Sequence, residues 1–312
     1  MKENQASFTA MSVAYMRAYH SINAADKIFD DFLAYELIPD DKRALVEQYL
    51  IEQNMIWDQE LNDSEYAILQ SEHTNSSESL MRATRRFEGF FNSRARYAED
   101  ALKIAIKQGV KQYVILGAGM DTFAFRQPET LEQLEVFEID HPATQEFKLH
   151  RLAELGWKHP AKLHFIPIDF TQGSLISALT NSSSYDPKLK TFFNWFGVTY
   201  FLTRDEVFTT FRSIKEISPA GSMIVFDYLD ADAFIPEKSS PQMQKTLQYL
   251  RKISEPMITG FDPSTLRDEL KCLGFSLQEN LGPEDIKERY FKRHTEEYPI
   301  HEHGHFACAV VE

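Results

Sequence analysis

Two glycines and an acidic residue that follows them carry the first chemical signal in this chain. Gly117 and Gly119 come directly after the apolar run 113–116, which is typical of a strand buried on both faces of a parallel sheet. Glycine has no Cβ, so the backbone can turn tightly there and approach a ligand closely. Asp140 ends a second strand-like stretch, 21 residues after Gly119. An acid at about this spacing accepts hydrogen bonds from ribose hydroxyls, so the pattern predicts a site for a nucleotide cofactor.

The residue three positions after Gly119 separates two kinds of cofactor. A dinucleotide fingerprint, G-x-G-x-x-G, requires glycine there, and this chain has Thr122. A pyrophosphate site is therefore disfavoured, whereas S-adenosylmethionine needs the glycine turn and the acid only. An ordinary strand-to-helix turn with an acid at this spacing by chance stays open as the alternative.

The motifs LGAGMDT at 116–122, followed by Arg126, and FEIDHP at 137–142 together resemble the leucine carboxyl methyltransferase family. This family consists of class I S-adenosylmethionine-dependent methyltransferases and includes bacterial members similar to polyketide O-methyltransferases. The resemblance extends from about residue 8 to the C-terminus. It implies an α/β, Rossmann-like fold with a seven-stranded, mostly parallel sheet, helices on both faces and an N-terminal helical cap.

The resemblance also implies a set of residues around the cofactor. Arg94 would hold the carboxylate of its methionine part, because a planar guanidinium pairs with a carboxylate through two hydrogen bonds, although Arg96 is a rival. Asp169 would accept from the adenine amino group, and Phe170 would lie against the ring. The full expected set is Arg94, Gly117, Ala118, Gly119, Asp121, Asp140, Asp169, Phe170 and Trp195.

The segment 191–203 resembles the fourth-strand motif of the family, with one departure. Members that methylate protein carboxyl termini carry an acid where this chain has Phe196. Its loss favours an apolar small molecule over a protein terminus. We therefore expect O-methylation of a hydroxyl of a small, polyketide-like metabolite. The alternative is methyl-ester formation on a small acid or a protein C-terminus. The segment also lacks an Asn/Asp-Pro-Pro-Tyr/Phe sequence, which disfavours methylation of amino groups on nucleic-acid bases.

A hydroxyl acceptor would need a group that takes its proton. The candidates are His303, His305, Tyr200 and Asp227, with Tyr228 beside them. His301, His303 and His305 alternate along the chain, so in an extended segment they would project from one face and could bind a divalent metal. A loop or the start of a strand is the more common setting for such a cluster, so no metal site is predicted.

Composition limits the class of partner. The chain has 312 residues and a formal net charge of −14, and nucleic-acid affinity depends mainly on Lys and Arg neutralising phosphates. We therefore expect no nucleic-acid partner. No apolar segment of membrane-spanning length and no signal peptide is recognised. The two cysteines, Cys272 and Cys308, form no disulfide framework. These features predict a cytoplasmic protein without a membrane partner.

The elements that must position these residues follow an alternating β/α pattern. Helices are expected at 8–16, 28–34 and 41–58, a polar loop at 74–79, and helical structure to about 108. Strands are expected at 113–116, 134–140, 163–168, 191–196, 222–228, 275–278 and 306–311. We predict a helical cap over residues 1–90 and a cofactor-binding core over 91–312, with 230–262 contributing to the substrate lid. A dimerisation element is the alternative role of the helical region.

Two rival classes of function stay open. A nicotinamide-dependent enzyme is opposed by the missing third glycine, and a non-catalytic protein that only binds the cofactor would keep the same glycine turn. The expected partners are a small-molecule acceptor and either a carrier protein or a second copy of the chain.

Overall fold

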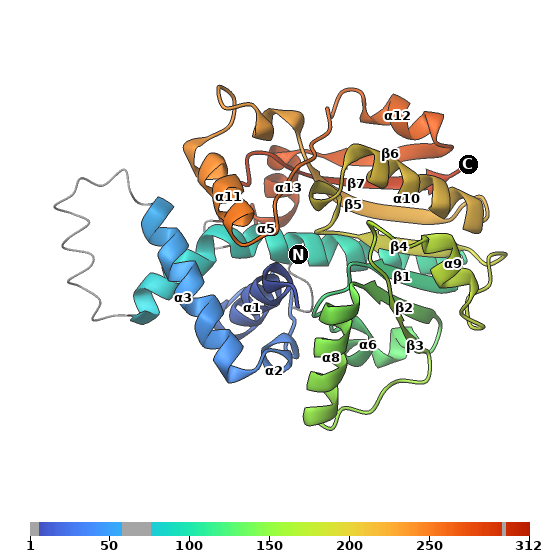
Figure 1. Cartoon of the computed structure of the whole chain (residues 1–312), viewed down its shortest axis with the longest axis horizontal. Helices are drawn as coiled ribbons and strands as arrows, with labels where there is room; N and C mark the ends of the chain where they lie inside the picture. Colours follow the sequence, from blue (N-terminus) through green and yellow to red (C-terminus); the bar gives the residue numbers. More distant parts are fainter. Residues whose placement is uncertain (1–5, 58–75, 295–297) are drawn as a thin grey trace.

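The fold is built on one seven-stranded sheet in the order β3-β2-β1-β4-β5-β7-β6. The computed structural model describes residues 6–57, 76–294 and 298–312. Strands β1 to β5 pair in parallel, and β7 runs antiparallel to both β5 and β6. The bounds are β1 (Gln112–Leu116), β2 (Glu135–Asp140), β3 (Leu163–Pro167), β4 (Thr191–Trp195), β5 (Met223–Leu229), β6 (Phe275–Leu281) and β7 (Gly304–Val311). The predicted mostly parallel seven-stranded sheet is confirmed (Figure 1).

Helices connect these strands and cover both faces of the sheet (Figure 1). Those before the first strand are α1 (Phe8–Asn23), α2 (Ala34–Leu37), α3 (Asp40–Trp57) and α5 (Ser76–Lys107). Those of the first half of the sheet are α6 (Phe123–Arg126), α7 (Pro128–Leu131), α8 (Pro142–Glu154) and α9 (Leu175–Thr180). The later ones are η1 (Thr199–Phe201), α10 (Arg204–Ile217), η2 (Ala231–Phe234), α11 (Pro241–Lys252), α12 (Leu266–Cys272) and α13 (Pro283–Tyr290).

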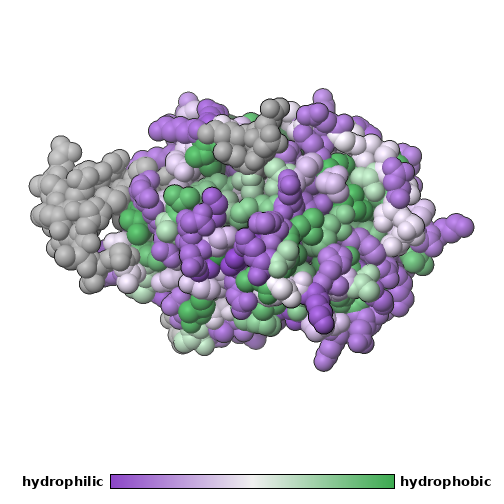
Figure 2. Space-filling view, turned by 60° about the horizontal axis from the view of Figure 1, so that its bottom comes forward, coloured by the Kyte–Doolittle hydropathy of each residue, from purple (hydrophilic) through white to green (hydrophobic). Residues whose placement is uncertain are grey.

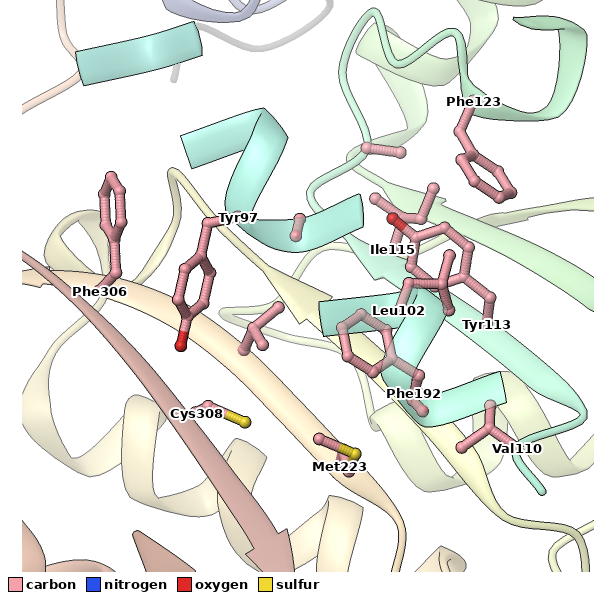
Figure 3. Close-up of a cluster of buried hydrophobic side chains, with 14 of the residues drawn as sticks. Tyr97, Leu102, Val110, Tyr113, Ile115, Phe123, Phe192, Met223, Phe306 and Cys308 are labelled. Atoms are coloured by element: carbon pink, nitrogen blue, oxygen red, sulfur yellow. The ribbon is translucent and has the colours of Figure 1, made fainter. Parts of the chain in front are cut away.

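Two buried clusters hold the helices to the sheet. On one face Tyr97 and Leu102 of α5 pack with Tyr113 and Phe192 of the central strands (Figure 3). On the other face Phe211 of α10 packs with residues from the same strands that point the opposite way. Because both faces are covered, the central strands are apolar almost throughout, as the sequence pattern predicted. These two clusters hold in place the edge of the sheet where β1, β2 and β4 end.

The N-terminal helices form a third cluster beside the sheet. Met11 and Tyr15 of α1 pack with Val46 and Leu50 of α3. The start of α1 is tied to α8, since the Ser7 backbone N–H donates to Thr144 Oγ1 at 3.1 Å. Helix α5 runs continuously through residue 90, the predicted boundary between cap and core. The division into two units stays a prediction.

One predicted helix is wrong. Residues 28–33 form a turn, and α2 begins only at Ala34. The Ile28 N–H donates to the buried His20 side chain at 2.9 Å, and the side chain of Asp31 is buried against Arg17. These tertiary contacts override the helical pattern. Of the predicted loop at 74–79, residues 76–79 belong to α5, and 74–75 lie outside the described residues.

None of the helices in the described part of the chain is long and apolar enough to cross a membrane. On the face shown in Figure 2, hydrophilic side chains surround smaller hydrophobic areas.

Candidate active site

A single large cavity brings most of the predicted residues together. It lies over the ends of β1, β2 and β4, between the sheet and helix α1, and has a volume of about 1290 Å³. This size suits a nucleotide cofactor together with a small second ligand. The predicted residues that line it are Arg94, Gly117, Ala118, Gly119, Asp121, Asp140, Asp169, Phe170 and Tyr200.

The glycine turn forms the floor of this cavity. Gly117 and Gly119 have φ values of +74° and +50°, in the left-handed region that favours glycine. A Cβ on Gly117 would lie 2.3 Å from Val198 Cγ2, and a Cβ on Gly119 would lie 3.0 Å from Ala10 Cβ. Both glycines are therefore required by the approach of neighbouring segments as well as by the backbone.

Asp140 stands beside the turn at the end of β2. Its carboxylate accepts from the backbone N–H of Gly119 and, at 2.6 Å, from that of His141. Burial raises its pKa above the usual value, and the two backbone donors oppose that rise. These bonds hold the carboxylate at the cavity wall, where its remaining lone pairs can accept from a ligand hydroxyl.

A buried ion pair supports the turn from below. Lys148 of α8 pairs with Glu138 of β2, and both side chains are 1% exposed. Lys148 Nζ also donates to the backbone carbonyl of Asp121 at 2.6 Å. Asp121 lines the cavity, and its side chain accepts from Phe123 N–H at 2.7 Å. The pair therefore ties α8 and β2 to the segment that follows the glycines.

This ion pair predicts a pH dependence of stability. Burial raises the pKa of Glu138 to about 7, against 4.5 for the free side chain. The folded state thus binds the proton more tightly than the unfolded state, so Glu138 lowers stability progressively as pH rises from about 4.5 through 7. In urea unfolding, the stability of Glu138→Gln relative to the wild type is expected to increase across this window. The exposed Glu132→Gln is the control, and an equal change for both variants would contradict the assignment.

Asp169 and Phe170 follow β3 and line the same cavity. Asp169 accepts from the backbone N–H and the hydroxyl of Thr171, at 2.9 and 2.7 Å. Burial opposes ionisation, but these bonds hold the pKa of Asp169 below its usual value. The carboxylate therefore stays an acceptor at neutral pH, as its expected role at an exocyclic amine requires.

Arg94 is held in place by an acid from β5. Its Nη1 donates to Asp227 Oδ2 at 3.0 Å and to Tyr200 Oη at 3.3 Å. Within the described chain the remaining guanidinium nitrogens of Arg94 have no protein acceptor. The rival Arg96 is half exposed and pairs with Asp100 at 2.7 Å, outside the cavity. The position therefore favours Arg94 as the group that receives a ligand carboxylate.

Most of the predicted proton acceptors lie outside the cavity. His303 Nδ1 is 2.9 Å from Asp230 Oδ1, and the ring of His305 stacks on Tyr228 with centroids 4.9 Å apart. Asp227 is fully buried and contacts the cavity lining through Arg94 and the Gly197 N–H. The expectation that His303, His305, Asp227 or Tyr228 takes a proton from a ligand there does not fit these positions. Among these candidates, only Tyr200 lines the cavity.

Trp195 also lies away from the cavity, contrary to the expectation that it contacts the cofactor. Successive strand residues point to opposite faces, so Asn194 and Phe196 face the cavity, whereas Trp195 faces the core. Its ring packs against Phe211 with centroids 5.5 Å apart. Aromatic residues stand at both odd and even positions of 191–196. The sequence pattern therefore did not indicate which of them face the cavity.

Several cavity residues were not foreseen from the sequence. Arg17 of α1 lines the cavity and donates to the Met120 carbonyl at 2.9 Å. Glu255 accepts from the backbone N–H groups of Phe8 and Thr9, each at 3.2 Å, so it caps α1 over the cavity. No local pattern marks these residues, because each acts on a segment far away in the chain. The lid role of 230–262 stays a prediction.

Comparisons with known proteins agree with this geometry. The family model described as leucine carboxyl methyltransferase matches residues 10–215. The putative S-adenosyl-L-methionine-dependent methyltransferase YktD of Bacillus subtilis is 34% identical to this chain over 99% of both chains. A putative S-adenosyl-L-methionine-dependent methyltransferase of Mycobacterium avium is 34% identical over 44% of each chain.

Among solved structures, a duf574 family protein from Streptomyces avermitilis shares the fold. Its TM-score is 0.51 at 12% identity, over 73% of this chain and 85% of that one. The match of the family model to about two thirds of the sequence, and the end-to-end similarity to the Bacillus protein, establish the classification. This chain belongs to the leucine carboxyl methyltransferase family.

Proposed function

We propose that this protein transfers a methyl group from S-adenosylmethionine to an oxygen of a small apolar molecule, and that this oxygen belongs to a carboxylate. Family membership supports the methyltransferase activity and the cofactor. The choice of acceptor rests on the side chains that line the cavity. One observation carries it: of the predicted bases, only Tyr200 lines the cavity in the described part of the chain.

The cavity fits the cofactor. S-adenosylmethionine supplies an electrophilic methyl group on a sulfonium. Gly117 and Gly119 both line the cavity, and without side chains they leave their backbone open to a ligand there. Asp140 would accept from ribose hydroxyls, and Asp169 and Phe170, which line the same cavity, would contact the adenine ring.

The acceptor would lie against an apolar wall beyond Arg94. This wall is formed by Phe196, Phe201 and Met257, with Tyr200 beside them. Helix α1, capped by Glu255, covers the cavity and limits the access of water. Exclusion of water and alignment of the two reacting groups are the protein's contributions to such a transfer.

The polar groups at this wall do not favour an acceptor that must lose a proton. Burial raises the pKa of the Tyr200 phenol far above its usual value, so it stays protonated at neutral pH. Arg94 is a cation bound to Asp227. A carboxylate is already ionised at neutral pH and needs no base. An arginine near the wall also stabilises such an anion until it reacts.

A hydroxyl of a polyketide-like metabolite is the second candidate. It is favoured by Phe196, which packs edge-on against Tyr97 and Phe306 with centroids 6.0 and 5.5 Å apart. This aromatic surface suits a flat, apolar acceptor. A carrier protein could deliver such a substrate, and the enzyme could work as a homodimer. Both partners remain predictions.

Removal of the ribose acceptor tests the cofactor assignment. Asp140→Ala is expected to weaken S-adenosylmethionine binding by about 1–3 kcal/mol, the range for a lost hydrogen bond to a buried group. Calorimetric titration measures the change. Glu132→Ala, at an exposed position in the turn before β2, should bind with wild-type affinity. Unchanged binding by Asp140→Ala would remove Asp140 from the site.

The function itself is tested in two steps. Titration with S-adenosylmethionine, S-adenosylhomocysteine and NAD should give binding of the first two only, and NAD binding alone would overturn the proposal. Incubation of apolar acids and phenols with methyl-labelled cofactor then identifies the acceptor. Alkali releases labelled methanol from a methyl ester but not from a methyl ether, so the product separates the two candidates. Binding without transfer to either class would support the non-catalytic alternative.

A further inference from the structure

Asn194 is a buried amide in the middle of the sheet that faces the cavity. It pairs with Ile115 of β1 in the register of β4, and it is 8% exposed. Its neighbours on the same face are Tyr113 and Phe196, which line the cavity as well. The side chain therefore lies just below the glycine turn, on the side of the sheet where Arg94 stands.

Only one end of this amide is satisfied by the protein. Asn194 Nδ2 donates to Tyr113 Oη at 3.0 Å. Asn194 Oδ1 is buried and has no hydrogen-bond partner among the described residues. A buried carbonyl oxygen without a partner is destabilising, and most such groups in folded proteins are paired. An unpaired acceptor that lines a cavity indicates that a ligand supplies the donor.

The charges around the cavity indicate which donor this is. Arg94 has guanidinium nitrogens free to receive a carboxylate, as shown above. The other arginines of the cavity are occupied: Arg17 by Asp31 and the Met120 carbonyl, and Arg126 by Glu99 and the Thr122 hydroxyl. Consider a ligand with a carboxylate and a hydrogen-bond donor on one carbon. Its carboxylate would bind Arg94, and its donor would bind Asn194 Oδ1. The amino-acid end of S-adenosylmethionine has this form, with an ammonium as the donor.

We propose that Asn194 binds the ammonium group of the methionine part of S-adenosylmethionine through Oδ1. Tyr113 is a positioning residue in this arrangement, because its hydroxyl holds Nδ2 and directs Oδ1 to the cavity. The inference rests on the proposed function, since it takes S-adenosylmethionine as the cofactor. It adds a binding residue that the family motifs of this sequence did not indicate.

Two ligands that differ only in the amino group test this inference. The probes are S-adenosylhomocysteine and its deaminated analogue, titrated calorimetrically into the full chain. Asn194→Leu is expected to lower the affinity for S-adenosylhomocysteine about tenfold or more, as for a lost hydrogen bond to a charged group. The affinity for the deaminated analogue should not fall, and its binding shows that the variant is folded. Asn194→Asp should keep the preference for the amino ligand.

A matched control is available on α5. Asn92 is a fully buried amide whose Oδ1 also lacks a partner among the described residues, but it does not line the cavity. Asn92→Leu should leave both affinities unchanged. Tyr113→Phe, which frees the amide to rotate, should lower the preference for the amino ligand by less than Asn194→Leu does. If Asn194→Leu does not fold, Asn194→Ala answers the same question.

Other outcomes overturn the inference without ambiguity. Equal losses for both ligands would mean that Asn194 supports the cavity without contacting the ammonium. Unchanged binding of both would mean that water or the acceptor satisfies Oδ1. Failure of the wild-type protein to bind S-adenosylhomocysteine at all would instead overturn the proposed function.

Discussion

Replacing Gly119 with arginine is expected to abolish binding of S-adenosylmethionine in a calorimetric titration. The φ of Gly119 is +50°, which a residue with a side chain adopts only with strain. Its Cβ would lie 3.0 Å from Ala10 Cβ in helix α1. The rest of the arginine would have to extend into the cavity, where it would occupy the cofactor's space and place a cation beside the sulfonium. Steric and electrostatic effects therefore act in the same direction.

Gly156 provides the control for the backbone part of this effect. Its φ is +66°, and nothing lies within 4 Å of a Cβ built there. Gly156→Arg should cost about 1 kcal/mol of stability for the left-handed backbone and should leave cofactor binding at the wild-type level. Binding by Gly119→Arg with wild-type affinity would mean that the glycine turn is not the cradle.

The parts of the site that are local in sequence could be predicted. The glycine turn and Asp140 are each set by a strand and the residues directly after it, and β1 and β2 pair in parallel. Parallel neighbours bring their carboxyl ends to one edge, so a short motif was enough to place both groups. Asp169, just after β3, the next strand in the sheet, was expected from the resemblance to the family.

The parts that depend on distant contacts could not be predicted. Glu255 caps a helix almost at the other end of the chain, and Arg17 reaches the cavity only because α1 lies across it. His303 and His305 were expected near a ligand as candidate proton acceptors. The fold instead puts Asp230 between them, with His305 Nε2 at 3.5 Å from its second oxygen. The alternating spacing indicated that the two side chains share a face, but not which residue that face contacts.

Loss of Asp227 is expected to be the most destabilising single change in the site. Asp227→Leu would leave the Arg94 guanidinium buried without its acid. It would also remove Asp227 Oδ1, which accepts from the Gly197 N–H at 2.7 Å in the wild type. Breaking a buried pair by removing one partner costs about 3–5 kcal/mol, which urea unfolding would show. Cofactor affinity should fall as well, because nothing then holds Arg94 in place.

Arg94→Leu, which removes the other partner of this ion pair, is expected to change how stability depends on pH. Burial already raises the pKa of Asp227, and Arg94 opposes that rise. In Arg94→Leu the opposition is lost, so the folded state binds the Asp227 proton more tightly than the unfolded state does. The stability deficit of Arg94→Leu relative to the wild type should therefore grow as pH rises above the pKa of Asp227 in the wild-type fold, which already lies above the 3.8 of a free aspartate. A deficit that is constant with pH would show that packing, and not charge, causes the loss.

The double variant Arg94→Leu/Asp227→Leu separates stability from binding. With both charges gone, no ion is left unpaired, and replacement of a buried pair by apolar residues is often close to neutral. We expect this variant to regain most of the stability that Asp227→Leu loses, while its affinity for S-adenosylmethionine stays low because no guanidinium meets the carboxylate. Full recovery of affinity would move the carboxylate site away from Arg94. No recovery of stability would place the cost of Asp227→Leu on the orphaned Gly197 N–H. The expected result separates two requirements of this pair. Folding needs only that no charge is left unpaired, whereas cofactor binding needs the Arg94 cation itself.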